Sequence, residues 1–410
     1  MNRKHVAAWA LYDFANSAYP AVVQTAVFSV FYITAVVGNE AGRGDWWCGR
    51  AVSTSVLIVA LTAPLLGAVA DRAGIRKRLL FLFTAMCLVG VTLFTTIQPG
   101  MVVWGFALYV FANVGFESAL VFYNAYLPEI APREKQGWVS GLGFGVGYLG
   151  SVAGLLLGLA FVSNLKLVWL SVVVFFALFS IPTFLVLPRD VPGEMTVRRA
   201  AGWGLRSFRQ IVGEVLAIRE LRRFLLAYFF YIDGILTVIV VAGSIAVTTF
   251  GFDQKGTILL FLVVQMSALA GAFALARPTD RFGPKRVLNG VILLWVAAGV
   301  TAWFITSQTA FFALAVVAGF GLGSAQSASR AFLSSLIPPG KEAEVFGFYA
   351  FCGKSSSILG PTLFGYVAAR SGGNQRLAVL ALTTMYVVGL LLLQRVRDPK
   401  AVAPASSGSA

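Results

Sequence analysis

The sequence predicts an all-α membrane protein with twelve transmembrane helices in two pseudo-symmetric six-helix halves. The composition, the recurrence of long apolar stretches and the alternation of basic loops all predict it. The chain has 410 residues, of which 58% are hydrophobic and only 12% are charged. A soluble protein usually carries about 25% charged residues. A bilayer lets apolar side chains face outward, so this composition is typical of a polytopic membrane protein.

Apolar stretches of roughly 20 residues cross about 30 Å of hydrocarbon as a helix, and they recur along nearly the whole chain. Backbone polar groups in lipid must be paired internally, so each stretch should be helical. The first stretch is too long for a signal peptide and should remain as the first span. The predicted spans are 8–37, 47–70, 79–97, 101–126, 137–162, 166–187, 222–249, 256–276, 287–307, 309–336, 343–369 and 375–396.

Lysine and arginine lie mainly in alternate loops, with a roughly fourfold bias to one side of the predicted membrane. The favoured side holds the cluster from Arg72 to Arg78 and the tail residues Arg395, Arg397 and Lys400. Because cytoplasmic loops are the basic ones, we expect both termini in the cytoplasm. The net charge of +15 is therefore attributed to topology rather than to nucleic-acid binding. The compact chain suggests a cell membrane, specifically the bacterial inner membrane.

The longest polar stretch, 188–221, divides the chain between its halves. It begins with Pro188 and Pro192 and continues with arginines interleaved with apolar residues. This pattern is typical of an amphipathic helix on the inner membrane surface. The predicted organisation is an N-terminal six-helix bundle (1–187), a cytoplasmic linker (188–221), a C-terminal six-helix bundle (222–396) and a cytoplasmic tail (397–410).

The two halves carry matching loop sequences. The loop between spans 2 and 3 reads DRAGIRK from Asp71, and the loop between spans 8 and 9 reads DRFGPKR from Asp280. The triplet AYL from Ala125 is echoed by AFL from Ala331. Internal duplication is the architecture of many secondary transporters, in which the substrate binds at the interface of the repeats.

The loop from Gly67 to Arg78, GxxxDRxGxRKR, resembles the loop 2–3 signature of the major facilitator superfamily, although Ala276 replaces the glycine in the second copy. Four further segments are WALYDFANSAY from Trp9, YNAYLPEI from Tyr123, VSGLG from Val139 and IPPGKEAEVFGFY from Ile337. Together they resemble the UMF1 (unknown major facilitator) branch, which is related to the autophagy-linked vacuolar amino-acid effluxers of fungi. The resemblance covers essentially the whole chain and implies the major facilitator fold.

A carboxylate at the end of span 2 can pair with the arginines that follow it and lie near a helix N-terminus. The resemblance implies that this motif steadies an outward-open state at the inner surface. The competing interpretation is that these positive loops only fix the orientation of the chain. The predicted gating residues are Gly67, Asp71, Arg72, Gly74, Arg76, Asp280, Arg281 and Gly283.

Ionisable side chains inside spans are costly and therefore indicate function. In this superfamily spans 1, 4, 7 and 10 line the central cavity, and four of the five ionisable residues within predicted spans fall there. Helical spacing places Asn113, Glu117 and Asn124 on one face of span 4 and Asp13 with Asn16 on one face of span 1. The predicted substrate-binding residues are Asp13, Asn16, Asn113, Glu117, Asn124, Asp233, Gln326, Arg330 and Lys354.

Carboxylates and cations together can bracket a zwitterion such as an amino acid or a small peptide. Desolvation favours the protonated form of a buried carboxyl group, so Glu117 and Asp233 are candidates for proton coupling. Two structural interpretations compete. Arg330 near the end of span 10 could snorkel to the interface, and Lys354 could form a buried ion pair with Asp233.

We therefore expect a monomeric secondary transporter of a small polar organic solute, with no metal or cofactor. His5 is the only histidine, which argues against histidine-based metal sites. The sequence lacks HExxH, GxSxG and GxxxxGK[ST] motifs, which argues against an enzyme or an ATP-driven pump. Two alternatives stay open: an exporter of hydrophobic drugs or lipids, which the 34 phenylalanines permit, and a non-transporting sensor with a carrier fold.

Overall fold

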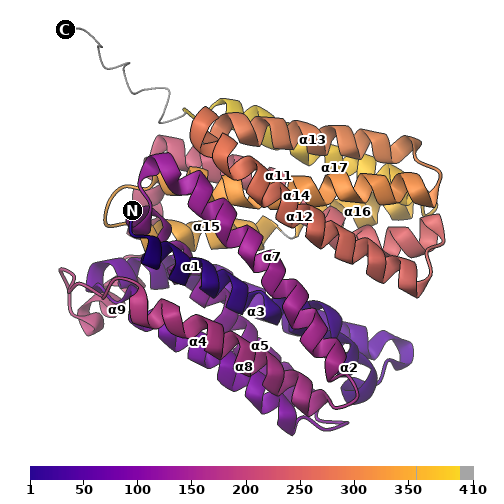
Figure 1. The fold of residues 1–410 in the computed structure, drawn as a ribbon, viewed down its shortest axis with the longest axis horizontal. Coiled ribbons are helices and arrows are strands. Elements are labelled where there is room, and N and C mark those ends of the chain that lie inside the picture. Colours follow the sequence, from indigo (N-terminus) through magenta and orange to yellow (C-terminus); the bar gives the residue numbers. More distant parts are fainter. Residues whose placement is uncertain (357, 398–410) are drawn as a thin grey trace. The chain divides into compact units, whose positions relative to one another are not determined.

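The computed structural model describes residues 1–356 and 358–397, and every regular element in these two ranges is a helix (Figure 1). The predicted tail from residue 398 onward, with Lys400, lies outside them. Eleven helical segments are long and apolar enough to cross a membrane. They are Arg3–Val37, Arg43–Ala73, Arg76–Thr96, Val102–Ile130, Arg133–Ala160, Leu165–Val186, Arg219–Phe250, Lys255–Phe282, Pro284–Phe304, Gln308–Leu336 and Gln375–Gln394.

The predicted span 343–369 differs from the other predicted spans, because two shorter helices cover it: α15 (Glu342–Ser356) and α16 (Leu359–Arg370). Pro361 lies in the first turn of α16, where the missing N–H of proline has no helical partner to lose. Eleven long segments and this pair are consistent with twelve predicted spans and with the predicted fold class.

The first span is not a regular α-helix. It consists of α1 (Arg3–Asn16), the π-helical η1 (Pro20–Ala26), α2 (Phe28–Phe31) and the π-helical η2 (Tyr32–Val37). The change of helix type occurs at Pro20, whose ring removes a backbone donor and disturbs the regular hydrogen-bond ladder. Pro20 therefore marks the point where the first span departs from a regular α-helix.

The chain divides into two compact units. Unit 1 comprises Met1–Ile130, Val146–Ile211 and Pro339–Lys354, whereas unit 2 comprises Ala131–Gly145, Val212–Pro338 and Ser355–Ala410. Each unit therefore contains a short segment that belongs to the opposite half of the sequence. The start of α7 (Gln136–Ala160) lies in unit 2, and most of α15 lies in unit 1. The predicted boundaries at 188 and 222 stay predictions.

Unit 1 is built around close contacts between its spanning helices. The residues of α7 that belong to this unit lie against α1, where Gly150 allows its backbone to approach the carbonyl of Phe14. Trp9 stacks on Tyr123 with ring centroids 4.6 Å apart. The other helices of this unit are α3 (Arg43–Ala73), α4 (Arg76–Leu93), α5 (Val102–Asn124), α6 (Leu127–Ile130), α8 (Leu165–Val186) and α9 (Val197–Arg206), with the short η3 (Glu40–Gly42) and η4 (Phe94–Thr96).

Unit 2 uses the same packing principle. Gly271 and Gly323 bring α12 and α14 together, because a Cβ at either position would lie about 2 Å from a backbone oxygen of the other helix. Helix α10 (Phe208–Ala217) begins in unit 1 and ends in unit 2. The other elements of unit 2 are α11 (Arg219–Phe250), α12 (Gln254–Phe282), α13 (Pro284–Phe304), α14 (Gln308–Leu336), α16, α17 (Gln375–Gln394) and the short η5 (Arg133–Lys135).

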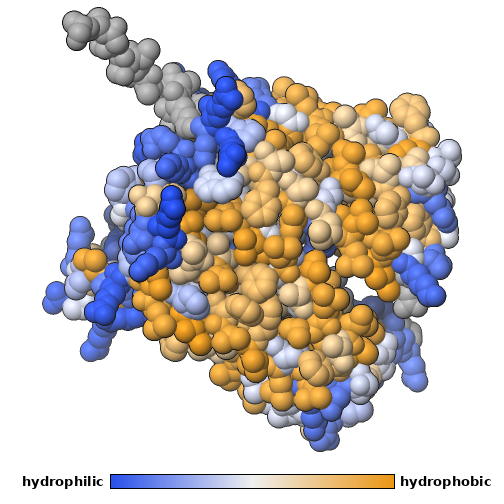
Figure 2. Space-filling view, viewed as in Figure 1, coloured by the Kyte–Doolittle hydropathy of each residue, from blue (hydrophilic) through white to orange (hydrophobic). Residues whose placement is uncertain are grey.

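The surface has the character of a protein that faces lipid. Figure 2 shows hydrophobic side chains over most of the visible face, with hydrophilic ones around the N-terminus and α9 and further groups at the opposite edge of the face. Exposed large apolar residues include Leu159 and Leu185 in unit 1 and Val240 and Phe304 in unit 2. A soluble chain rarely exposes so much contiguous apolar surface.

Gly150→Ala should destabilise the protein, because the added Cβ would lie 2.0 Å from the Phe14 carbonyl oxygen. We expect a loss of about 1–3 kcal/mol, the usual cost of overpacking, and a lower thermal unfolding midpoint in detergent. Gly158→Ala is the matched control on the same helix, since its Cβ would make ordinary 3.6 Å contact with Val22. Equal midpoints for the two variants would contradict the α1–α7 contact.

Candidate functional site

Glu117 and Lys354 form an ion pair in unit 1. Glu117 lies on α5 with 7% of its surface exposed, and Lys354 lies in the last turn of α15. The Lys354 Nζ atom is 2.6 Å from Glu117 Oε1. The alternative in which Lys354 pairs with Asp233 is therefore wrong. A charge this deep in a spanning helix needs such a partner, because an unpaired buried ion is costly.

A polar cluster lies one turn away on the same face of α5. Asn113 Oδ1 accepts a 2.6 Å hydrogen bond from Gln24 Nε2, and Asn113 Nδ2 donates a 2.8 Å bond to Ser55 Oγ. The Tyr19 hydroxyl is 3.5 Å from the same Asn113 oxygen. Gln24 comes from the π-helical segment η1. The sequence reasoning missed Ser55, because a single serine in an apolar span carries no periodic signal.

The other predicted residues of unit 1 lie apart from this cluster along α1 and α5. Asp13 and Asn16 are buried on α1, before the π-helical segment, and Gly147 of α7 packs closely against the Asp13 backbone and Cβ. Asn124 is the last residue of α5 and is half-buried. Of the three residues predicted to share one face of α5, Asn113 and Glu117 lie one turn apart, whereas Asn124 lies at the end of the helix.

Asp233 is fully buried in unit 2 and holds the start of α16. Its Oδ2 atom accepts a 2.7 Å hydrogen bond from the Gly360 N–H, and its Oδ1 atom accepts one of 3.3 Å from Thr237. A Cβ at Gly360 would lie 2.1 Å from Thr237 Oγ1. Thr237 could have been found from its i+4 spacing to Asp233, whereas Gly360 gives no such signal.

Arg330 is also held inside unit 2. Its Nη2 atom donates to the Ser140 carbonyl at 2.8 Å, and its Nε atom donates to the Ser140 hydroxyl at 3.0 Å. The guanidinium lies 4.0 Å from the centre of the Phe144 ring, a cation–π distance. Only 2% of Arg330 is exposed, so the snorkelling interpretation is wrong. Gln326, one turn earlier on α14, is half-buried.

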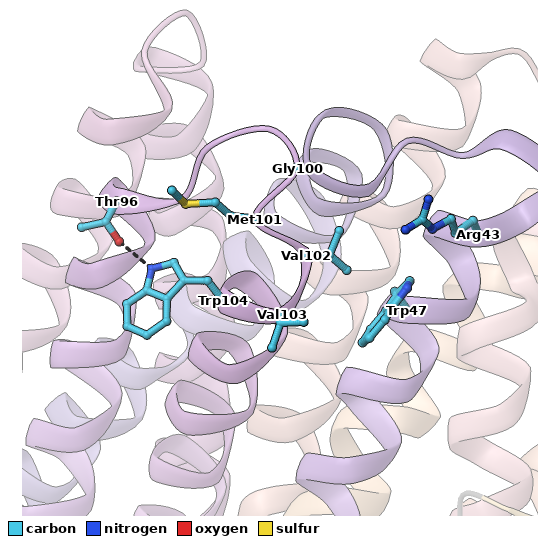
Figure 3. A pocket seen from close by; sticks show the side chains of 8 residues that line it. All are labelled: Arg43, Trp47, Thr96, Gly100, Met101, Val102, Val103 and Trp104. Carbon is cyan, nitrogen blue, oxygen red and sulfur yellow. Dashed lines mark hydrogen bonds between the residues drawn. The ribbon is translucent and has the colours of Figure 1, made fainter.

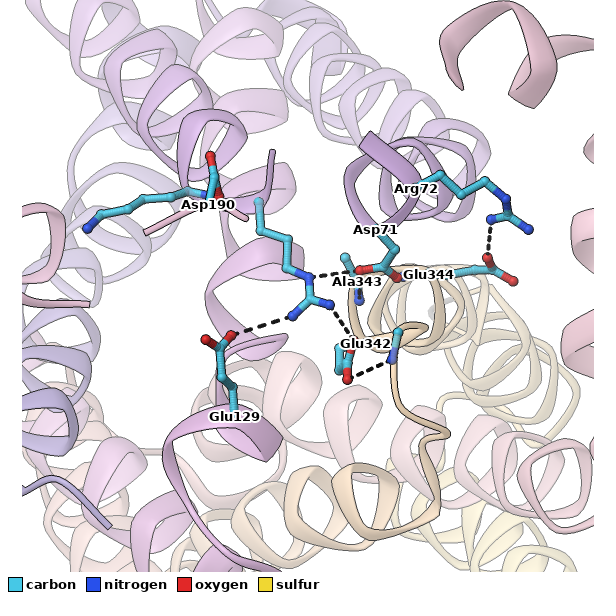
Figure 4. Close-up of polar contacts among 10 residues, drawn as sticks. Asp71, Arg72, Glu129, Asp190, Glu342, Ala343 and Glu344 are labelled. Carbon is cyan, nitrogen blue, oxygen red and sulfur yellow. Dashed lines mark hydrogen bonds and ion pairs between the residues drawn. The ribbon is translucent and has the colours of Figure 1, made fainter. Parts of the chain in front are cut away.

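The first gating motif is an acid–helix contact that also belongs to unit 1 (Figure 4). The Asp71 carboxylate accepts hydrogen bonds from the backbone N–H groups of Ala343, at 3.1 Å, and Glu344, at 2.8 Å. These groups open α15, where unpaired N–H groups and the helix dipole favour an anion. This is the kind of contact that the sequence predicts for Asp71.

Two arginines extend this contact. Arg76 donates to Asp71 at 2.8 Å, also pairs with Glu342, and lies 3.6 Å from Glu129. Arg72 is 2.8 Å from Glu344 (Figure 4). We call Asp71, Arg72, Arg76, Glu342 and Glu344 the first clamp. It joins the end of α3 to the start of α15 by charge-assisted hydrogen bonds, which are stronger than neutral ones.

The second motif repeats the acid–helix geometry of the first. In unit 2 the Asp280 carboxylate accepts hydrogen bonds from the N–H groups of Gly137, at 2.7 Å, and Trp138, at 2.8 Å, which open α7. Trp138 lies under Arg277 at 5.3 Å, and Arg281 is exposed. We call this contact the second clamp. It retains the acid and the helix start, but its opposing helix lacks counterparts of Glu342 and Glu344.

The glycines of both motifs permit close approach or unusual backbone geometry. A Cβ at Gly67 would lie 2.2 Å from the Ala343 carbonyl oxygen, so only glycine lets α3 approach α15 this closely. Gly74 ends α3 with φ +64°, and Gly283 precedes α13 with φ +90°. Both angles lie where glycine is strongly favoured.

A pocket of about 730 Å³ lies in unit 1, at the start of α3 and around the loop between η4 and α5 (Figure 3). It includes none of the predicted site residues. Trp104 on its wall donates a 2.9 Å hydrogen bond to Thr96. The lining residues are Arg43, Trp47, Thr96, Gly100, Met101, Val102, Val103 and Trp104.

Comparison with known proteins decides the family. Residues 50–406 match the family described as "Vacuole effluxer Atg22 like". The chain belongs to the Atg22-like family. This Atg22-like protein is 30% identical over 408 residues to the uncharacterized MFS-type transporter YxiO of Bacillus subtilis, covering 95% of this chain and 94% of that one. It is 25% identical to autophagy-related protein 22 of Coccidioides immitis, covering 92% and 77%.

Solved structures show the fold of this Atg22-like protein. The human organic anion transporter MFSD10 superimposes with a TM-score of 0.79 at 16% identity, covering 96% of this chain and 99% of that one. The proton:xylose symporter XylE gives 0.76 at 14% identity, covering 97% and 96%. The Atg22-like protein is therefore a multi-pass membrane transporter of the major facilitator superfamily, as the sequence resemblance implies.

A double-mutant cycle tests the Glu117–Lys354 pair. Glu117→Gln and Lys354→Met should each lower stability by roughly 1–3 kcal/mol, less than for a fully buried pair because 31% of the Lys354 side chain is exposed. The double variant should recover most of the loss, since both charges are gone. Thermal unfolding in detergent measures all four proteins. A parallel cycle of Asp233→Asn with Lys354→Met should be additive; additivity in the first cycle would refute the pair.

Proposed function

We propose that this transporter carries a small polar organic solute, such as an amino acid or a small peptide, by proton-coupled alternating access. The Glu117–Lys354 pair carries the proposal. It places one acid and one base side by side within apolar spans, 2.6 Å apart. A hydrophobic solute would not repay the cost of burying both charges.

The pair offers complementary partners for a zwitterion. The carboxylate of an amino acid can replace Glu117 on the Lys354 ammonium, and its amine can replace Lys354 on the Glu117 carboxylate. Exchanging one ion pair for another avoids leaving a charge unpaired. The Asn113 cluster, with Gln24 and Ser55, supplies neutral hydrogen-bonding groups one turn away that can orient the bound solute.

Glu117 and Asp233 are the proposed proton carriers. Glu117 holds Lys354 at the end of α15, and Asp233 holds Gly360 in the first turn of α16. These helices follow one another in the chain. A proton on Glu117 cancels the attraction to Lys354, and a proton on Asp233 weakens its acceptance from Gly360. Proton binding therefore loosens consecutive helices, which links it to movement.

The two clamps are the proposed gates. The first clamp binds α3 to α15, and the second binds α12 to α7. In each case the helix start comes from the opposite half of the sequence. A change of conformation that moves these helices must break the acid–N–H contacts. The ion pairs of Arg72 with Glu344 and of Arg76 with Glu342 add strength to the first clamp.

The family description names an effluxer, so export is the direction to test first. The relative from Bacillus subtilis is bacterial, which supports the bacterial inner membrane as the location. The excess of basic residues in alternate loops supports cytoplasmic termini. The proposed transporter is expected to act as a monomer.

Glu117→Gln should abolish coupled transport. We expect proteoliposomes with the unaltered protein to accumulate at least one labelled amino acid or small peptide from a panel when a pH gradient is applied. Glu117→Gln should reduce this accumulation to that of protein-free liposomes, because glutamine cannot exchange a proton. Glu134→Gln, at an exposed glutamate of η5, is the control. Normal gradient-driven uptake by Glu117→Gln would exclude a role for this residue in proton coupling.

Asp71→Asn should free the start of α15. Loss of the charge at a helix N-terminus costs about 1–2 kcal/mol, so amide hydrogen exchange across 343–347 should accelerate about 5- to 30-fold. Mass spectrometry of exchanged peptides measures it. Asp280→Asn should instead accelerate exchange across 137–141. Unchanged exchange at 343–347 in Asp71→Asn would show that the first clamp does not hold α15.

A further inference from the structure

Helix α9 covers part of an apolar stripe on α3. Leu57 and Leu61 lie four residues apart and are 58% and 57% exposed. Leu65 and Val69 continue the same stripe, but Gly204 of α9 lies against both, and Val69 is only 7% exposed. The last part of the stripe is therefore covered by α9, whereas the part at Leu57 and Leu61 is exposed.

The opposite face of α9 is basic. Ala200 is fully buried against Val69, Ala73 and Ile75, so this side of the helix faces α3. Arg198, Arg199 and Arg206 are all exposed, and a rotation of 100° per residue places them roughly 160°, 100° and 120° around the helix from Ala200, away from α3. Because α9 packs beside the last turns of a spanning helix, we expect these guanidinium groups to reach lipid headgroups.

Helix α9 also contacts the first clamp. The Arg72 guanidinium lies 3.8 Å from the centre of the Trp203 ring, and the same guanidinium pairs with Glu344 at 2.8 Å. Arg72 is thus held between the indole of α9 and the carboxylate of α15. A cation–π contact of this kind fixes the orientation of the guanidinium.

The chain leading into α9 is tied to the same loop. Met195 N–H donates to the Arg72 carbonyl at 3.1 Å, and Gly193 N–H donates to that of Ala73 at 3.3 Å. The Asp190 carboxylate accepts from the backbone N–H groups of Lys77, at 2.7 Å, and Arg78, at 3.1 Å, at the start of α4. The position of α9 is therefore coupled to the loop that carries Arg72.

We propose that Arg198, Arg199 and Arg206 bind anionic phospholipid headgroups, and that this binding holds Arg72 on Glu344 through Trp203 and so stabilises the first clamp. The ligand is a lipid phosphate, because the arginines lie beside the lipid-exposed stripe of α3 and guanidinium groups match phosphate geometry. The regulatory half of the inference rests on the proposed gating role of the first clamp.

The test compares the full-length protein in two kinds of nanodisc. One contains phosphatidylcholine alone, and the other contains about one third phosphatidylglycerol, an anionic lipid. Amide exchange across 343–347 reports the first clamp, and native mass spectrometry counts retained phosphatidylglycerol. We expect slower exchange in the anionic discs, with a change of roughly fivefold for each arginine engaged.

The variants separate lipid binding from coupling. The triple variant Arg198→Gln, Arg199→Gln, Arg206→Gln should lose both the retained lipid and the slower exchange. Arg133→Gln with Lys135→Gln, at exposed positions of η5, should keep both. Trp203→Leu should keep the lipid but lose the slower exchange, and Trp203→Phe, which retains a ring face, should keep both.

The outcomes that overturn the inference are distinct. Lipid-dependent protection that survives in the triple variant would remove these arginines from the site. Slower exchange in neutral discs after addition of inorganic phosphate would identify a soluble anion, not a lipid, as the ligand. Protection retained in Trp203→Leu would refute the link through Arg72. If Asp71→Asn alone fails to change exchange at 343–347, the gating proposal fails, while loss of retained lipid in the triple variant would still support the lipid site.

Discussion

A carboxylate at the end of one spanning helix meets the unpaired N–H groups at the start of another, and the chain uses this contact twice. Asp71 accepts from Ala343 and Glu344, and Asp280 accepts from Gly137 and Trp138. Each clamp satisfies donors that a helix cannot satisfy itself. The close approach of α3 to α15 depends on this contact and on the missing side chain of Gly67. The arginines of the first clamp and α9 then build on it.

The architecture could be predicted from sequence because composition, apolar length and loop charge all report the membrane directly. Asp71 and Asp280, the acids of the two clamps, could also be predicted, because a motif repeated at matching places indicates a repeated geometry. The sequence analysis predicts one continuous span over 343–369, although the polar run from Gly353 to Ser356 and Pro361 mark the place where α15 gives way to α16. Length and apolar character set the span, whereas helix continuity depends on local backbone contacts.

The sequence identified the candidate site residues better than it identified the groups that those residues contact. Glu117, Asp233 and Lys354 were recognisable as charges within apolar spans, but their pairing depends on which segments pack together. Lys354 meets Glu117 because most of α15 belongs to unit 1, and Asp233 meets Gly360 because α16 belongs to unit 2. Sequence spacing gives contacts within one helix, such as Asp233 with Thr237, but not contacts between helices far apart in the chain.

Two of the helical segments that pass from one unit to the other, α7 and the α15–α16 pair, differ in mechanical character. In α7 the hydrogen-bonded helix continues from Gln136 to Ala160, whereas the other passage consists of the separate helices α15 and α16. A continuous helix transmits torque along its length, while a jointed pair can bend without breaking a ladder of hydrogen bonds. A bending force would therefore deform α15 and α16 more readily than the single helix α7.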